Sequence, residues 1–147
     1  MSEANPKQRR APGEKYGAGP SQPTDDPSRT ARSILQIRNR QRRQPVDVRL
    51  LRQILASALT DELGVARYEI GIHLVGASEM TRVNETFLRH AGSTDVITFS
   101  HREPPSPTEL HGEVFVCVDE AVELAPRFRG TWQSEVVRYA VHAFLHL

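Results

Sequence analysis

Two histidines near the end of this 147-residue chain, His142 and His146, have the spacing needed to bind one metal ion together. Side chains four residues apart on a helix project from the same face, with Cβ atoms about 5 to 6 Å apart. Catalytic zinc commonly takes three protein ligands and keeps one position for water, so the pair supplies two of the three. The spacing fits two histidines at the boundary of a packed helix equally well, and on these residues alone both interpretations stay open.

The residues around the pair argue against the commoner hydrolases. In the metalloprotease motif a glutamate directly follows the first histidine and activates water, but here that position is Ala143. The segment 92–94 lacks the lysine and the spacing of a phosphate-binding loop, and no serine lies in a nucleophile elbow. The single cysteine, Cys117, lies in an apolar run and is expected to be a buried strand residue, not a nucleophile.

The pair must be positioned by a helix predicted over residues 133–147. Its apolar residues recur at helical spacing, and Glu135 and Tyr139 lie on the same stripe as the two histidines. We expect the apolar side of this helix to pack against the rest of the domain. The residues of that side are Val137, Ala140, Val141, Phe144 and Leu145.

Four strands and three more helices are predicted upstream. The strands are expected at residues 34–37, 68–75, 94–99 and 112–118, with a proline-containing loop over 101–111. In the second strand, alternation places His73 on the polar, surface side. The helices are expected from an Asp47 N-cap to Leu63, from a Ser78 N-cap with Met80, Val83 and Phe87 on one face, and from an Asp119 N-cap to Pro126. These elements predict an α/β fold, a single domain in which helices cover a small mixed sheet of about four strands.

Composition is that of an ordinary soluble protein, with 38% hydrophobic and 25% charged residues. No apolar run approaches the roughly 18 residues that span a bilayer. No apolar stretch follows the basic residues near Met1, which argues against a secretory signal and predicts a cytoplasmic protein without a membrane partner.

The first 32 residues differ from the rest in composition. They are rich in proline and glycine and hold few apolar side chains, so we expect a disordered tail before a folded domain at 33–147. Residues 1–43 hold ten Lys/Arg and four Asp/Glu, a net charge of +6, and residues 44–147 hold nine and fourteen, a net charge of −5. Such a basic arm suits either contact with nucleic acid or simple solvation.

Four segments, in this order, resemble the YbeY family of rRNA maturation endoribonucleases. The most specific are Thr94-Asp95-Val96-Ile97-Thr98-Phe99, which is preceded by Val83-Asn84 and Phe87, and the His-x-x-x-His-Leu end at His142 to Leu147. Two shorter segments support them: Ile37-Arg38-Asn39-Arg40-Gln41 is similar to the family's opening strand, and Gly112-Glu113-Val114 is similar to its Gly-Asp-Ile strand start. The resemblance covers about three quarters of the chain, from Ser33 onward.

The resemblance implies a cytosolic α/β hydrolase that cuts single-stranded RNA and matures the 3′ end of 16S rRNA in ribosome biogenesis. Its expected partners are a single-stranded rRNA precursor and the ribosomal small subunit. It implies one zinc ion (Zn²⁺) held by His142, His146 and a third histidine a few residues further on. Arg89 is expected to bind a phosphate group of the RNA. Asp95 is expected either to orient the site or to bond nearby backbone at the start of its strand.

The sequence departs from the family pattern in three places. Ala143 replaces a glycine, which a helix tolerates because alanine is the better helix former. Leu88 stands where many members carry arginine, and Arg89 follows one place later, about 100° around a helix. Finally, the sequence stops at Leu147, so we expect the motif to be truncated and the third ligand to lie beyond that residue. A non-catalytic ribosome or RNA-binding factor is therefore the alternative.

Overall fold

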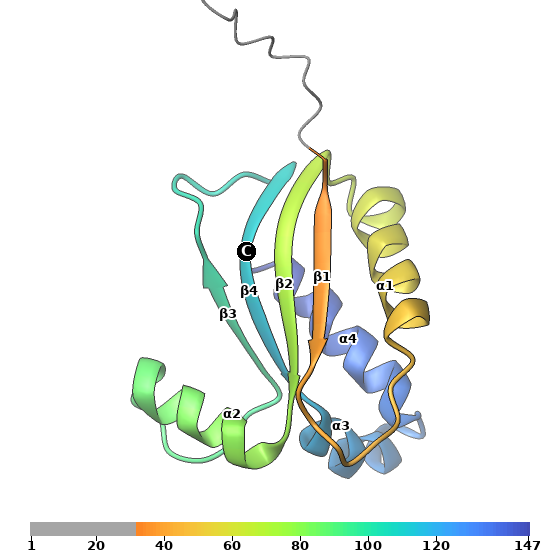
Figure 1. Cartoon of the computed structure of the whole chain (residues 1–147), viewed down its shortest axis with the longest axis vertical. Helices are drawn as coiled ribbons and strands as arrows, with labels where there is room; N and C mark the ends of the chain where they lie inside the picture. The colour runs from red at the N-terminus through yellow and green to blue at the C-terminus, as the bar shows by residue number, and fades with distance from the viewer. Residues whose placement is uncertain (1–31) are drawn as a thin grey trace, which may run out of the picture. The chain divides into compact units, whose positions relative to one another are not determined.

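A mixed sheet of four strands forms the centre of the fold (Figure 1). The computed structural model describes residues 32–147, so the tail expected at 1–32 lies outside them except for its last residue. The strand order is β1 (Ile34–Asn39), β2 (Arg67–Val75), β4 (Glu109–Cys117) and β3 (Val96–Ser100). The first three are parallel, and β3 runs antiparallel to β4. The predicted mixed four-strand α/β domain is thereby confirmed.

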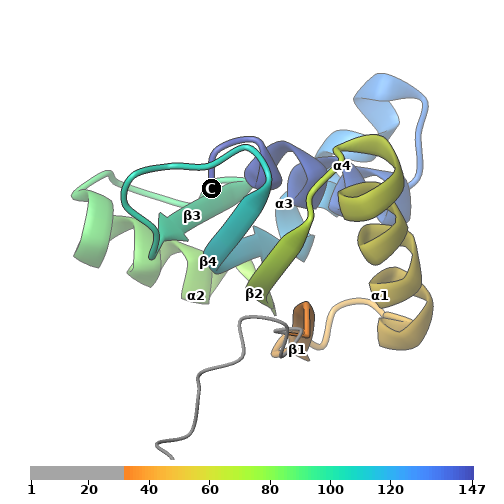
Figure 2. The same cartoon turned by 90° about the horizontal axis from the view of Figure 1, so that it is seen from above.

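Helices cover both faces of the sheet unequally (Figures 1 and 2). On one face α1 (Val48–Ser57), α3 (Val118–Leu124) and α4 (Trp132–Phe144) enclose the main core. On the other face α2 (Ala77–Val83) packs over the lower part of β3 and β4 and encloses a smaller core around Met80 and Ile97. Short irregular turns extend three of the helices, π-helical at Ala58–Glu62 and Asn84–Leu88 and 3-10 at Ala125–Phe128.

The predicted strand positions are correct to within a few residues. β4 begins at Glu109, three residues before the expected start, so the loop between β3 and β4 is shorter than the predicted 101–111. β3 begins at Val96 because the side chain of Asp95 occupies the turn before it and accepts a hydrogen bond from the Val96 amide (2.8 Å). The strand alternation holds, since Ile70, Ile72 and Leu74 are all buried in the main core.

The prediction that His73 is a surface residue is wrong. Its side chain does lie on the face opposite the main core, but it is only 7% exposed. The ring stacks on Phe115 of the neighbouring strand, with centroids 4.6 Å apart, and its Nε2 lies 2.5 Å from Oε2 of Glu113. The alternation pattern found the correct face, but cross-strand neighbours, which the pattern cannot show, cover this position.

The predicted N-cap of α1 is confirmed, because the side chain of Asp47 accepts a hydrogen bond from the Leu50 amide (3.0 Å). The predicted N-caps of α2 and α3 are wrong. The N-cap of α2 is Gly76, not Ser78, and the N-cap of α3 is Cys117, not Asp119. Asp119 instead reaches α2, where its Oδ2 accepts from the Ala77 amide at 2.6 Å. The carboxylate of Asp119 thus accepts a hydrogen bond from the first turn of α2, as the side chain of a local N-cap residue would.

Phe87 does not share the buried face predicted for it. Met80 and Val83 are buried, but Phe87 is 64% exposed. The turn Asn84–Leu88 is π-helical, and this wider turn changes the rotation per residue, so the helical phase is lost after Val83. The aromatic side chain is left at the surface.

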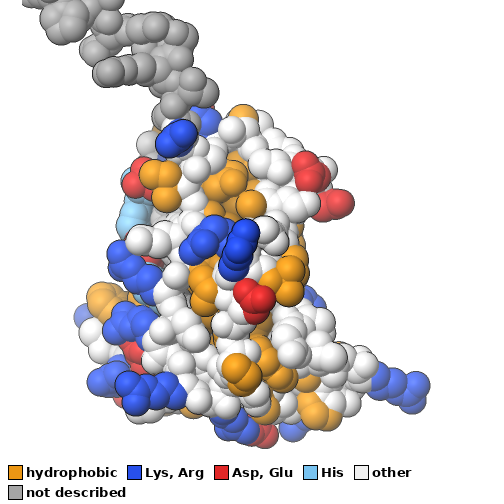
Figure 3. Space-filling view, turned by 45° about the vertical axis from the view of Figure 1, so that its right-hand side comes forward, with side chains coloured by type: hydrophobic (Ala, Val, Ile, Leu, Met, Phe, Trp, Pro, Cys, Tyr) orange, Lys and Arg blue, Asp and Glu red, His pale blue; other side chains and the backbone are white. Residues whose placement is uncertain are grey.

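The α1 side of the molecule has two distinct surface features. Arg52 on α1 donates from Nε to the carbonyl oxygen of Leu35 (3.3 Å) on β1, the edge strand of the sheet. Hydrophobic side chains also gather in a band on this side of the molecule (Figure 3), where Leu50 and Ile54 are 51% and 41% exposed. No helix within residues 32–147 has both the length and the apolarity to cross a membrane.

Candidate metal centre

The helix that carries the histidine pair is fixed at both ends. Thr131 and Ser134 form a reciprocal capping box at its start. The helix ends at Phe144, three residues before the predicted end, and a tight turn follows in which the amides of Leu145 and His146 donate to His142 and Ala143. The buried side consists of Glu135, Val136, Tyr139, Ala140, Ala143 and Phe144. Leu145, predicted to lie on it, is 65% exposed.

His142 and His146 come together at the surface. Both side chains are exposed, their ring centroids are 4.7 Å apart, and their Nε2 atoms are 3.2 Å apart. Zinc–nitrogen bonds of about 2.0 to 2.1 Å at a tetrahedral angle place two ligand atoms about 3.3 Å apart. The two nitrogens therefore fit as two ligands of one tetrahedral ion. Among residues 32–147, no cluster of three or more His, Cys, Asp or Glu side chains could hold a metal ion.

A loop from the sheet borders this end of α4. The Oγ of Ser100 donates to the carbonyl oxygen of Leu147 (3.0 Å), which ties the end of β3 to the turn after α4. A hollow of about 350 Å³ lies between the loop and the turn. It is lined by Leu63, Val65, Pro105, Ser106, Pro107, Leu110, Phe144, Leu145 and Leu147.

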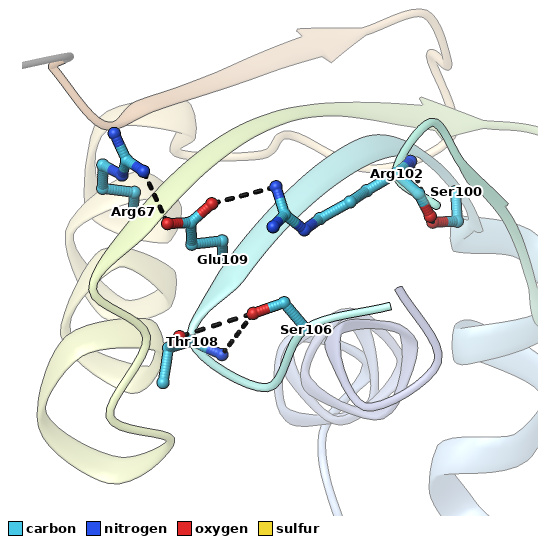
Figure 4. A network of polar contacts seen from close by, with 6 residues as sticks. All are labelled: Arg67, Ser100, Arg102, Ser106, Thr108 and Glu109. Carbon is cyan, nitrogen blue, oxygen red and sulfur yellow. Dashed lines mark hydrogen bonds and ion pairs between the residues drawn. The ribbon is translucent and has the colours of Figure 1, made fainter. Parts of the chain in front are cut away.

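The same loop is anchored to the sheet by an ion-pair network (Figure 4). Glu109 pairs with Arg67 at 2.5 Å and with Arg102 at 2.9 Å. The hydrogen bond from Arg67, with the charges of both arginines, lowers the pKa of Glu109 below its ordinary value. Ser106 and Thr108 bond to each other within the loop. These contacts hold the loop that borders the end of α4.

Asp95 lies near α4 but not at the histidines. Its Oδ1 accepts hydrogen bonds from the Val96 amide and from the hydroxyl of Thr94 (3.2 Å), as a residue at a strand start would. Its charge also reaches Tyr139, one helical turn before His142. No hydrogen bond joins Asp95 to either histidine in the described part of the chain.

Arg89 lies on the other side of the sheet, in the turn that follows α2. It ends the π-helical turn in the left-handed conformation (φ 54°), and its side chain is exposed. Within residues 32–147 it forms no ion pair. The structure thus brings together His142 and His146, places Asp95 near their helix, and does not bring Arg89 into contact with them.

A polar cluster on α4, in which Glu135 and Tyr139 are buried and Arg138 is exposed, was only partly predicted. Glu135 is 4% exposed and accepts from Nε of Arg138 (3.1 Å), whose guanidinium lies over the rings of Phe128 and Tyr139. Burial, and then the charge of Glu135, raise the pKa of Tyr139 to about 12. Sequence reasoning placed Glu135 and Tyr139 on this stripe but missed Arg138, although a Glu–Arg spacing of three on a helix signals such a pair.

Asn84, another of the motif residues, has a structural role in this fold. Its side chain is 5% exposed, and its Nδ2 donates to the carbonyl oxygen of Gly92 at 2.9 Å. This bond closes the loop between α2 and β3. It therefore fixes the segment that leads into Thr94 and Asp95.

Comparison with known proteins gives consistent results. The family model described as Endoribonuclease YbeY matches residues 36–147. A protein named Endoribonuclease YbeY from Salinibacter ruber is 32% identical over 108 residues, covering 69% of this chain and 68% of its own. The protein of that name from Finegoldia magna is 31% identical over 118 residues, covering 78% and 77%. The solution structure of a Thermotoga maritima protein is similar with a TM-score of 0.56 and 25% identity, over 78% of this chain and 71% of that one.

Proposed function

The chain belongs to the YbeY endoribonuclease family, and from this membership we propose that it is a zinc-dependent endoribonuclease specific for single-stranded RNA. Its proposed role is maturation of the 3′ end of 16S rRNA during ribosome biogenesis in the cytoplasm, acting on precursor RNA of the small subunit. The observation that carries the proposal is the 3.2 Å separation of the two Nε2 atoms of His142 and His146.

In the proposed site, His142 and His146 hold the ion and take no further part in the reaction. When bound, zinc would supply Lewis-acid activation of water and of a phosphoryl oxygen. Both imidazoles are exposed at the end of α4, so RNA can reach them without an opening of the domain. The loop held by the Glu109 network is tied through Ser100 to Leu147, the residue that follows His146.

Two further residues have proposed roles in positioning. Asp95 is held by the Val96 amide, so its carboxylate can fix the start of β3 against α4 at Tyr139, one helical turn before His142. Arg89 is exposed and without an ion pair within residues 32–147, so its guanidinium can bind an RNA phosphate. Its position beyond α2 supports a contact with RNA that extends away from the metal.

A second candidate is a non-catalytic RNA-binding or ribosome-binding factor. It is favoured by one observation, that within residues 32–147 the histidine pair has no third ligand beside it. Two ligands hold zinc more weakly than a closed site does.

The two candidates differ in metal content and in cleavage. We expect zinc in the purified chain by mass spectrometry, with its loss in His142→Ala and in His146→Ala and its retention in His90→Ala, an exposed histidine elsewhere. We also expect cleavage of single-stranded RNA that a chelator stops. Equal zinc content in all four proteins, or cleavage that resists the chelator, contradicts the endoribonuclease proposal. RNA binding without cleavage supports the second candidate.

A further inference from the structure

An aromatic row crosses the sheet on the face that α2 only partly covers. Phe87 contacts Phe99 edge to face with ring centroids 5.4 Å apart, and Phe99 contacts Phe115 in the same way at 5.9 Å. Phe115 in turn stacks on His73. The row runs from the turn after α2 across β3 and β4 to β2. It lies on the face opposite α4 and the histidine pair.

The outer end of this row is unusually exposed. Phe87 is 64% exposed, and the adjacent Leu88 is 42% exposed. The edge-to-face contact with Phe99 holds the Phe87 ring in place while most of its surface faces solvent. A fixed aromatic ring at the surface is a platform on which another flat ring can stack at little cost in conformational entropy.

Arginines stand beside the exposed ring. A hollow of about 290 Å³ next to Phe87 is lined by Arg40, Glu79, Arg82, Val83, Thr86 and Phe87. The side chain of Arg40 is half exposed and pairs with Glu79 at 2.6 Å, whereas Arg82 is exposed and forms no ion pair within residues 32–147. Arg89 follows Phe87 by two residues. Arginine side chains also gather at the lower left of the molecule in Figure 3.

We propose that this surface, made of Phe87, Arg82, Arg40 and Thr86, binds single-stranded RNA outside the metal centre, stacking an unpaired base on Phe87 while the arginines bind the flanking phosphates. Bases of single strands are free to stack on aromatic rings, and arginine suits phosphate because its guanidinium can donate two parallel hydrogen bonds. An exposed aromatic ring between guanidinium groups matches an anionic partner that also carries flat rings. The proposal takes RNA as the partner from the proposed function.

Two acidic side chains, Glu79 and Glu85, lie in or near the hollow, and Glu79 gives the proposal a further test. Glu79 lies inside it and ties up part of Arg40, while Glu85 is exposed on the same turn and accepts from the Gly92 amide (3.4 Å). Glu79 therefore opposes phosphate binding in two ways, by its charge and by competing for Arg40. Removing that charge should strengthen RNA binding, an effect opposite to that of removing Phe87 or Arg82.

The test measures binding of a fluorescent single-stranded oligouridylate to the full chain in chelator, so that cleavage does not interfere. Phe87→Ala should weaken binding by about 5- to 150-fold, the range for loss of one stacked base, while Phe87→Trp should not weaken it. Phe128→Ala is the matched control, because Phe128 is 62% exposed and lies elsewhere. Arg82→Gln should weaken binding, its control Arg49→Gln on α1 should change it less, and Glu79→Gln should strengthen it.

A spectroscopic measurement separates stacking from indirect effects. Trp132 is the only tryptophan, so Trp132→Phe combined with Phe87→Trp leaves one reporter at the platform. Its emission should be quenched by the single strand and much less by a duplex of the same sequence. Unchanged emission, equal affinity of Phe87→Ala and the unaltered chain, or no measurable binding by the unaltered chain overturns the proposal. Because binding is measured without metal, a failed cleavage assay leaves this result unaffected, and the two failures can be told apart.

Discussion

The carboxylate of Glu113 reaches across residue 71 of the neighbouring strand to lie 2.5 Å from Nε2 of His73. It can do so because residue 71 is glycine, and a Cβ there would collide with the Glu113 carboxylate. The pair fixes a buried imidazole at the inner end of the aromatic row. Gly71 is thus required by a side chain on the next strand and not by its own backbone.

We predict that Gly71→Ala displaces Glu113 and leaves the buried His73 without this partner, at a cost of about 1 to 3 kcal/mol in the free energy of unfolding. Denaturant titration measures the loss. In a Glu113→Ala background the same substitution should cost much less, because the collision is absent. Equal costs in the two backgrounds would show that the glycine is needed for another reason.

Gly112→Ala should be more damaging than Gly71→Ala. A Cβ at residue 112 would collide with the backbone carbonyl of Phe99 and contact the side chain of Leu147. The Phe99 carbonyl belongs to the backbone of a paired strand and cannot rotate away, as the carboxylate of Glu113 can. The added Cβ must therefore push β3 away from β4. We expect a loss at or above about 3 kcal/mol, the upper end for overpacking, measured by the same titration. A smaller loss than that of Gly71→Ala would contradict the close approach of β3 to β4 at this position.

Tyr139 should give the chain a distinct response to alkaline pH. Its pKa is raised to about 12 in the folded protein, against an ordinary value of about 10 in the unfolded chain. The folded state therefore favours the protonated phenol, so the stability contribution is complete below about pH 10 and is lost as pH rises toward 12. The free energy of unfolding, measured against pH, should fall less steeply in Tyr139→Phe than in Tyr68→Phe. Identical slopes would count against the raised pKa.

Tyr139→Phe has a second expected effect at neutral pH. The Tyr139 hydroxyl is buried and has no hydrogen-bond partner within residues 32–147. Removing an unpaired buried hydroxyl while keeping the ring should leave the stability unchanged or raise it. Thermal unfolding at pH 7 tests this, and a clear drop in the melting temperature would reveal a partner for the hydroxyl.

The bond from Asn84 to Gly92 predicts a structural role for that motif residue. Asn84→Ala leaves the Gly92 carbonyl without its partner and should cost about 1 to 3 kcal/mol. Gln53→Ala, an exposed position on α1, is the control and should stay within about 0.5 kcal/mol. If the two variants are equally stable, the loop before Thr94 does not depend on this bond.

Much of the fold was predictable because it follows local patterns. The alternation of Ile70, Ile72 and Leu74 located β2, and the Asp47 cap located α1. The errors share a different origin, contact between distant segments. Asp119 caps α2 and not its own helix, and His73 is covered by Phe115 and Glu113 of another strand.

In the candidate site, too, the local features were predictable and the contacts between distant segments were not. The histidine pair was predictable because two side chains four residues apart on one helix lie next to each other. Where Arg89 lies relative to His142 depends on which face of the sheet α2 covers, and no local pattern contains that information. The π-helical turn that shifts the helical phase and exposes Phe87 could not be predicted from the sequence pattern either.

The bond between Arg52 and Leu35 bears on how the protein behaves at high concentration. An edge strand offers unpaired backbone groups to any other strand, and natural sheets guard such edges against aggregation. Here a guanidinium from α1 occupies a carbonyl of the edge strand, and a second copy adding to β1 would have to displace it and approach a positive charge. Exchanging that arginine for alanine would therefore be expected to favour fibrous self-association of otherwise folded molecules.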